Sequence, residues 1–175
     1  VEEGRERIYP SFLPHGTNTG RLSSSGPNIQ NWSEEARCII VPSEPGWVLW
    51  SADFGQIEPR LTAWLSKDAD RLARFDSPGF NEHKYVASLF FNIHYSGVVK
   101  SKDKDSFYGI AKRINNGANY CLGAKSIAKK YDWDLLETKR HYEEWRKLMP
   151  HCVAWQQETM REAETRHELY TPFGR

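Results

Sequence analysis

The spacing of apolar residues changes at Asp53 and divides the chain into two kinds of predicted structure. Before Asp53, the apolar runs Arg37–Val41 and Trp47–Asp53 predict two strands, and the Pro- and Gly-containing segment between them predicts an antiparallel hairpin. After Asp53, apolar residues recur at helical intervals and predict a helix over residues 56–66, with Ile57, Leu61, Trp64 and Leu65 on one side. The sequence therefore predicts an α+β fold in which part of an antiparallel sheet precedes a mainly helical region.

The remainder of the chain is predicted to be mainly helical. Helical spacing, capping residues and prolines predict further helices at residues 81–91, 105–118, 125–130, 134–150 and 152–166. Asp134 is expected to cap the fourth of these, and Pro150 to break or kink the chain before the fifth. The polar residues 1–36 predict an extended loop, and Tyr170–Arg175 predicts a strand and a turn.

Composition allows one domain with a real core, because 39% of the 175 residues are hydrophobic. The net charge of +1 excludes binding to nucleic acid through bulk charge alone, although residues 100–130 carry eight Lys or Arg against two Asp.

Three widely spaced cysteines without a CxxC pair indicate neither a disulfide framework nor a zinc site. With no signal peptide and no long apolar stretch, we expect a cytoplasmic protein.

The first of three motifs is TGRLSSSGPNIQNW, at Thr19–Trp32. A guanidinium and several amides at close spacing suit contacts with the minor-groove acceptors and the sugar-phosphate backbone of DNA. The candidate DNA-binding residues are Arg21, Asn28, Gln30 and Asn31. The alternative is an ordinary polar surface loop.

The second motif begins where the predicted strand ends, at SADFGQIEPR. A carboxylate at that position, Asp53, is a candidate ligand for Mg²⁺, and Glu58 one helical turn later could line the same cavity. The alternative is that Asp53 only begins a turn and caps the following helix.

The third motif is YGIAKRINNGANYCLG, at Tyr108–Gly123. On a helix, Lys112, Asn116 and Tyr120 fall at i, i+4 and i+8 and form one polar stripe, suited to a polyphosphate and a stacked base. Two glycines in the same helix, Gly109 and Gly117, predict close approach of another group. The alternative is an exposed lysine beside a core tyrosine.

In this order and spacing the three motifs resemble those of family A DNA polymerases, the DNA polymerase I-like enzymes. The first is similar to the family's TGRLSSxxPNxQN segment. DFGQIEPR is similar to motif A (DYSQIELR), and the segment at Lys112–Tyr120 is similar to motif B on the fingers helix. NEHKYVASLFF, which contains His83, is similar to the helix between motifs A and B.

The resemblance implies a role for each candidate residue in a DNA-directed DNA polymerase, a nucleotidyltransferase of DNA replication. Asp53 would be one of the carboxylates that hold two Mg²⁺ ions, and Gln56 and Glu58 would lie near the sugar of the incoming dNTP. The other nucleotide-binding residues would be His83, Lys112, Asn116 and Tyr120. Primer-template DNA would contact the residues of the first motif, together with Arg175.

Some residues differ from the family pattern. Tyr108 stands where motif B has an arginine, and Asn116 stands where it has an aromatic residue. Pro59 replaces an aliphatic residue of motif A, and Cys121 replaces a glycine after the motif B tyrosine. These departures are typical of a divergent phage or viral member, which would be cytoplasmic in its host.

The resemblance also predicts the organisation of the chain. Residues 1–66 would be the first part of the palm, 67–150 the fingers, and 151–175 a return helix to the palm. The HDE hairpin of motif C, which carries the family's second catalytic carboxylate, does not occur in the sequence. We therefore expect the isolated chain to be inactive and to need a complementing chain or segment.

Two other functions remain open at this stage. A single-subunit RNA polymerase would share the lysine–tyrosine helix, although Glu58 beside the sugar is expected to reject ribose. A non-catalytic remnant that binds primer-template would retain the fold without the chemistry. In both alternatives the partner is nucleic acid, and because the sequence has no long apolar stretch we expect no membrane partner.

Overall fold

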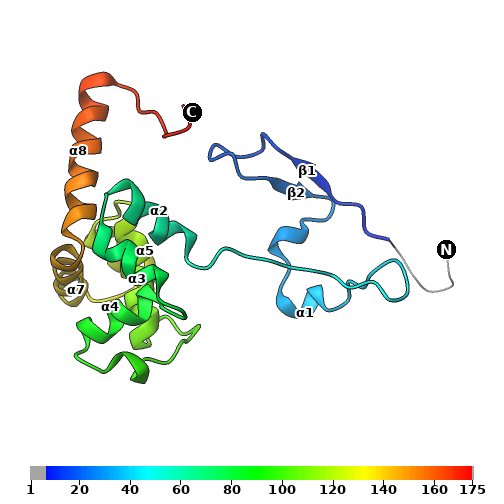
Figure 1. Ribbon diagram of the computed structural model, residues 1–175, viewed down its shortest axis with the longest axis horizontal. Coiled ribbons are helices and arrows are strands. Elements are labelled where there is room, and N and C mark those ends of the chain that lie inside the picture. Colours follow the sequence, from blue (N-terminus) through cyan, green and yellow to red (C-terminus); the bar gives the residue numbers. More distant parts are fainter. Residues whose placement is uncertain (1–6, 175) are drawn as a thin grey trace. The chain divides into compact units, whose positions relative to one another are not determined.

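The computed structural model describes residues 7–174, and the chain separates into two compact units, Val1–Asp53 and Phe54–Arg175 (Figure 1). Each unit is described by itself. Among the described residues, no helix is both long and apolar enough to cross a lipid bilayer.

The first unit contains a small antiparallel sheet followed by short helical turns. Strand β1 (Ser11–Leu13) pairs with β2 (Ser23–Ser25), with Phe12 opposite Ser24. A 3-10 helix η1 (Ile29–Asn31) and the short helix α1 (Glu34–Arg37) follow. The α+β class is therefore confirmed, with its strands inside the segment that was predicted to be an extended loop.

The predicted hairpin of Arg37–Val41 and Trp47–Asp53 is wrong. Arg37 ends α1, and no residue from 38 to 53 is in a strand. A strand is stabilised by ladder hydrogen bonds, and the one ladder among the described residues joins β1 to β2. Without a partner the apolar run is exposed, with Trp47 67% and Trp50 87% accessible. An apolar run favours a strand, but it does not specify which other segment pairs with it.

The second unit is helical, and its helices are close to those predicted. They are α2 (Ile57–Leu65), α3 (Ala69–Asp76), α4 (Glu82–Phe90), the 3-10 turn η2 (Tyr95–Gly97), α5 (Phe107–Asn119), α6 (Ala124–Tyr131), α7 (Leu135–Leu148) and α8 (Pro150–Arg166). Helix α3 was not predicted, and the strand expected within Tyr170–Arg175 is absent from its described part, residues 170–174. The division at residues 66 and 150 stays a prediction.

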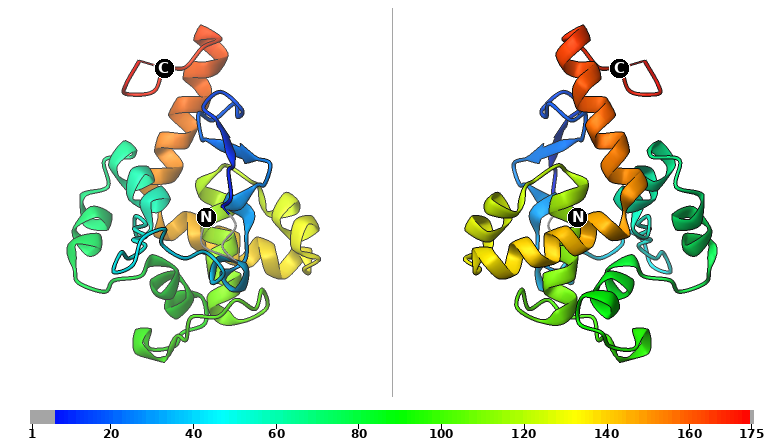
Figure 2. Two further views of the ribbon diagram at one scale, coloured as in Figure 1. Left: turned by 90° about the vertical axis from the view of Figure 1, so that its right-hand side faces the viewer. Right: turned by 90° about the vertical axis from the view of Figure 1, so that its left-hand side faces the viewer.

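Side-chain caps explain several helix boundaries. The side chain of Asp134 accepts from the backbone N–H of Glu137 at 2.8 Å at the start of α7, which confirms the predicted cap. Asn81 caps α4 and Ser106 caps α5 in the same way. Pro150 occupies the first turn of α8, where its missing N–H costs nothing. The axes of α7 and α8 consequently point in clearly different directions (Figure 2).

The core of the second unit lies where α4, α5, α6 and α7 meet. Ile114, on the buried face of α5, and Trp145, on α7, are both fully buried. Val86 from α4 and Ile127 from α6 complete this centre. One face of α5 is therefore held in the core, which fixes which of its side chains reach the surface.

Beside this core lies a buried ion pair between α3 and α4. Arg71 is fully buried and binds both carboxylate oxygens of Glu82, with 3.0 Å between Nη2 and Oε2. The side-chain amides of Asn115 and Asn119 on α5 extend the network, at 3.2 Å from Asn115 Nδ2 to Glu82 Oε2 and 3.3 Å from Arg71 Nη2 to Asn119 Oδ1. The pair thus connects three helices, through Arg71, Glu82 and Asn115, which are buried, and Asn119, which is half-buried.

Removing one charge of this pair should destabilise the second unit strongly. Glu82→Gln leaves the Arg71 guanidinium buried without its counter-ion, and we expect a loss of about 3–5 kcal/mol in the free energy of unfolding. Urea unfolding measures this loss. The control is Glu162→Gln, which breaks an exposed pair with Arg166 and should cost about 0.5 kcal/mol or less. Equal effects of the two substitutions would contradict the proposed importance of the buried pair.

Both glycines of α5 lie against neighbouring atoms, as the sequence predicted. A Cβ built on Gly109 would lie 2.0 Å from the backbone oxygen of Asp103. A Cβ on Gly117 would lie 2.9 Å from the terminal side-chain carbon of Ile127. The groups that approach these glycines are therefore parts of the protein itself.

The two glycines should respond differently to alanine. Gly109→Ala forces a backbone segment to move and should destabilise the unit by about 1–3 kcal/mol. Gly117→Ala meets a flexible side chain that can shift, and the roughly 1 kcal/mol gain in helix propensity partly offsets that contact. Urea midpoints compare the two variants directly, each serving as the other's control. A neutral or stabilising Gly109→Ala would show that the loop at Asp103 does not pack as described.

Candidate functional site

The polar stripe predicted on α5 is present. Lys112 and Tyr120 are exposed and Asn116 is half-buried, while Ala111, Ile114 and Ala118 are fully buried. Tyr120 is the C-cap residue of the helix and is 60% exposed. The helix therefore presents a cation, an amide and an aromatic ring along one accessible side.

A second set of polar groups joins α5 to the neighbouring helices. The Asn115 side-chain amide contacts His83 Nδ1 at 3.1 Å, and its oxygen accepts from Trp145 Nε1 at 2.7 Å. His83 is itself buried, and its ring lies edge-on to Tyr108 with 6.0 Å between centroids. Helix α5 is thus fixed to α4 and α7 by directed hydrogen bonds as well as by apolar packing.

Burial lowers the pKa of His83 to about 4. The nearby Glu82 carboxylate raises this pKa, whereas the Lys112 and Arg71 cations lower it, and burial has the largest effect. His83 is therefore neutral at neutral pH. It can accept or donate a hydrogen bond there, but it carries no positive charge for a phosphate.

The side chain of Gln56 joins the start of α2 to the start of α4. Its amide nitrogen donates to the carbonyl oxygen of Phe80 at 2.8 Å, and its oxygen accepts from the Glu82 N–H at 2.7 Å. Glu58 lies in the first turn of α2 and is half-buried. The structure thus gives Gln56 a clear role in connecting two helices.

Three of the candidate DNA-binding residues of the first unit, Asn28, Gln30 and Asn31, lie in η1 or at its cap, and Arg21 precedes β2. The buried Ser24 hydroxyl donates to Asn28 Oδ1 at 2.8 Å, and the Gln30 N–H donates to the same hydroxyl at 3.4 Å. The side chains of Arg21, Asn28, Gln30 and Asn31 are all on exposed residues. This small sheet and turn therefore present several donors at the surface, whereas Arg175 lies outside the described residues.

The expected metal site has one candidate ligand in the described structure. Asp53 is exposed and lies outside regular secondary structure, at the end of the first unit. Among residues 7–174, no group of three or more His, Cys, Asp or Glu is arranged to hold a metal ion. A single exposed carboxylate does not fit a pair of divalent ions by itself.

Sequence reasoning missed the buried polar network that joins α3, α4 and α5, chiefly Arg71, Glu82 and Asn115. Charged residues on an amphipathic helix are usually exposed, and no local pattern distinguished Arg71 from its neighbours. The missing information was the partner of Arg71, Glu82, which lies on another helix.

Burial raises the pKa of the Cys152 thiol to about 11, so this cysteine is not a nucleophile at neutral pH.

Comparison with known proteins identifies the family. The family model described as DNA polymerase family A matches residues 1–175. The chain belongs to DNA polymerase family A.

Individual family members are similar over nearly the whole chain. The thermostable DNA polymerase I of Thermus filiformis is 33% identical over 175 residues, covering 97% of this chain and 20% of the relative. DNA polymerase I of Helicobacter pylori is 31% identical, covering 100% of this chain and 19% of the relative. The chain thus spans about a fifth of the length of these curated relatives.

A solved structure of a family A polymerase shares the fold. It is the POL domain of Pol1 from M. smegmatis in complex with DNA primer-template and dNTP. The TM-score is 0.76 at 28% identity, over 97% of this chain and 30% of that chain. The fold and the family are therefore shown independently.

The lowered pKa of His83 predicts a pH-dependent contribution to stability. Between pH 6.5 and about 4 the unfolded chain binds a proton at His83 that the folded chain does not, so stability falls as pH falls through this window. His83→Gln should reduce the slope by up to about 1.4 kcal/mol per pH unit. Urea unfolding across the window measures the slope. His151→Gln, at an exposed position of α8, is the control, and an unchanged slope in His83→Gln would contradict the assignment.

Proposed function

We propose that the chain is part of a DNA-directed DNA polymerase, a transferase that adds deoxynucleotides to the 3′ end of a primer. The observation that carries this proposal is the stripe on α5 of exposed Lys112, half-buried Asn116 and exposed Tyr120, in a chain that belongs to DNA polymerase family A. The related M. smegmatis domain was solved with primer-template and dNTP, which are the partners proposed for this chain.

Lys112 is the proposed partner of the nucleotide triphosphate. Its ammonium group lies on the exposed side of α5 and can approach a polyphosphate without being desolvated first. Tyr120, at the end of the same helix, offers an exposed ring on which a base can stack. Asn116 lies between them and can donate or accept a hydrogen bond.

The role proposed for His83 follows from its burial. A neutral imidazole contributes no charge against the triphosphate, so the predicted nucleotide-binding role of His83 has no electrostatic support at neutral pH. We assign it instead to positioning, because Asn115 contacts both His83 and Trp145 and lies on the same helix as Lys112. His83 would thereby fix the orientation of α5.

Glu58 and Asp53 are proposed to act at the sugar and at the metal. A half-buried carboxylate in the first turn of α2 can exclude a 2′-hydroxyl, with Gln56 holding that turn against α4. Asp53 is the proposed ligand for Mg²⁺, whose chemistry in a polymerase would be to stabilise charge on the transferred phosphate. The described residues do not complete a two-ion site, and no catalytic step is derived from it.

Primer-template DNA is the proposed partner of the first unit. Sugar-phosphate and minor-groove contacts require positive charge and amides on exposed residues, which are supplied here by Arg21, Asn28, Gln30 and Asn31.

Comparing dNTP with rNTP incorporation would distinguish a DNA polymerase from a single-subunit RNA polymerase. The proposed complementing segment and cytoplasmic location stay predictions.

The proposal is tested by binding of a fluorescent dNTP in the presence of primer-template. Lys112→Ala should weaken this binding roughly tenfold or more, because a charge-assisted contact with the triphosphate is lost. The matched control is Lys129→Ala, which removes an exposed lysine from α6 and should leave binding unchanged. The assignment of Lys112 fails if the two variants bind equally well.

If the isolated chain binds no nucleotide, the same pair of variants is compared in primer extension after a segment carrying the HDE hairpin has been supplied. Loss of extension in Lys112→Ala but not in Lys129→Ala supports the proposal. Equal extension by both variants contradicts it.

A further inference from the structure

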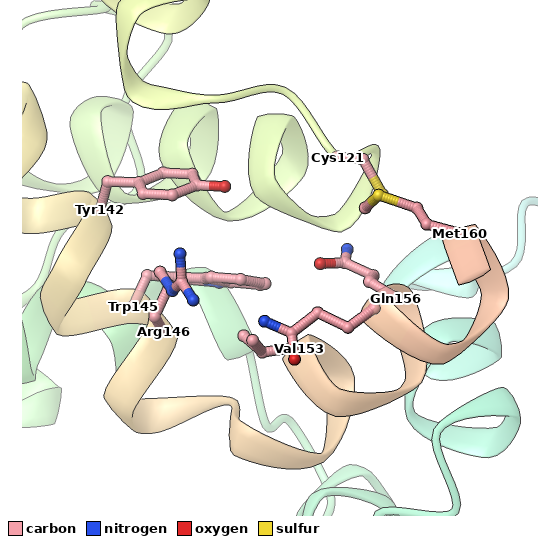
Figure 3. A pocket seen from close by; sticks show the side chains of 8 residues that line it. Cys121, Tyr142, Trp145, Arg146, Val153, Gln156 and Met160 are labelled. Carbon is pink, nitrogen blue, oxygen red and sulfur yellow. The ribbon is translucent and has the colours of Figure 1, made fainter. Parts of the chain in front are cut away.

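A cavity of about 140 Å³ lies between α7 and α8, close to the last turn of α5 (Figure 3). Trp145 from α7 and Val153 and Met160 from α8 supply its apolar lining. Its lining residues do not include the exposed stripe of α5, so it is a different feature from the proposed dNTP site. A cavity of this volume is too small to enclose a whole drug-sized ligand, so it can take at most one ring of a larger molecule.

Gln156 places an unpartnered acceptor in this cavity. The residue is 8% exposed, and its side-chain nitrogen donates to the carbonyl oxygens of Ala118 at 2.8 Å and Asn119 at 3.3 Å. These two bonds fix the amide, and among the described residues its oxygen has no hydrogen-bond partner. Figure 3 shows the amide directed into the space between α7 and α8. Gln156 Oε1 is not among the buried unpartnered side-chain atoms, so it is accessible and can accept from a ligand that carries an N–H.

Tyr142 supplies a second polar group from the opposite side. Its hydroxyl points into the cavity (Figure 3) and has no hydrogen-bond partner among the described residues. Burial raises the pKa of this hydroxyl, so at neutral pH it remains a proton donor. The cavity therefore offers an acceptor on α8 and a donor on α7.

The aromatic wall is held rigidly. Trp145 is fully buried, and its indole N–H donates to Asn115 Oδ1 at 2.7 Å, which fixes the orientation of the ring. The rings of Tyr142 and Trp145 have centroids 6.2 Å apart and planes 28° apart, so they leave no room for a third ring between them. A planar ligand would lie beside the pair, against Val153 and Met160.

We propose that this cavity binds a planar lactam ring, as found in uracil nucleotides, with the ring N–H donating to Gln156 and a ring carbonyl accepting from Tyr142. The size limits the ligand to one ring, because a cavity of roughly 150 Å³ admits a molecule the size of benzene. Arg146 also lines the cavity and can take a phosphate, since its contact with Glu143 is a loose 3.9 Å.

Binding would also act on α5. The Gln156 amide that would receive the ligand holds the Ala118 and Asn119 carbonyls, in the last turn before Tyr120. A ligand on the amide oxygen adds a third hydrogen bond to this group and so further stabilises the end of α5. The site would therefore couple occupancy of the cavity to the order of the Tyr120 segment.

Two cysteines allow a test on the intact chain. Cys121 lines the cavity, whereas Cys38 is exposed in the first unit and serves as an internal control. The alkylation rate of each thiol by iodoacetamide is followed by peptide mass spectrometry, with and without millimolar uridine monophosphate. We expect uridine monophosphate to slow alkylation of Cys121 several-fold and to leave Cys38 unchanged.

Matched ligands and variants test the assigned contacts. N3-methyluridine monophosphate lacks the ring N–H and should not protect Cys121. Tyr142→Phe should weaken binding of uridine monophosphate roughly three- to tenfold in calorimetry, while Tyr131→Phe, away from the cavity, should not. Equal protection by the methylated nucleotide, or unchanged binding to Tyr142→Phe, overturns the proposal.

A short oligodeoxyuridine distinguishes a free nucleotide from a base in a strand. Protection by the mononucleotide assigns the site to free nucleotides, and protection by the strand alone assigns it to a base of single-stranded nucleic acid. Both results support the lactam assignment. Absence of protection by either probe overturns it.

Discussion

The buried ion pair of Arg71 and Glu82 is the interaction on which the second unit depends. It joins α3 to α4 and, through two asparagines, both helices to α5. Charges removed from water must be compensated by direct partners, so the helices that carry these groups can adopt few alternative positions. Asn115 and Asn119 lie three and seven residues after Lys112 on α5, so the network borders the stripe along the same helix. The placement of Lys112 therefore depends on contacts that Lys112 does not make.

Local patterns predicted the helices and failed for the pairing of strands and charges. Asp134, Ser106 and Pro150 determine helix boundaries through interactions within a few residues, and such signals can be read directly from sequence. The run around Trp50 needed a distant partner to become a strand, and its own composition could not supply that partner. For the same reason Arg71 could not be predicted as buried, since Glu82 is on another helix.

In the candidate site, too, the features set by local spacing were predicted, and those that depend on distant residues were not. Lys112, Asn116 and Tyr120 were found because helical spacing alone places them together. Gln56 was predicted to lie at a nucleotide sugar, and the structure adds a role in joining α2 to α4, which depends on the backbone of Phe80 and Glu82. The role of Asp53 depends on groups far away in the sequence, so its assignment rests on membership in the family and not on local geometry.

The close contact at Gly109 has a mechanical consequence. The loop that lies against this glycine is also attached to the end of α6, because Lys104 Nζ donates to the Tyr131 carbonyl at 2.8 Å and Trp133 Nε1 donates to Asp105 at 2.7 Å. A rotation of α5 about its own axis would carry the loop with it and would pull on the end of α6. The loop, α5 and α6 should therefore move together, and the distance between Lys112 and Tyr120 should stay constant during the movement.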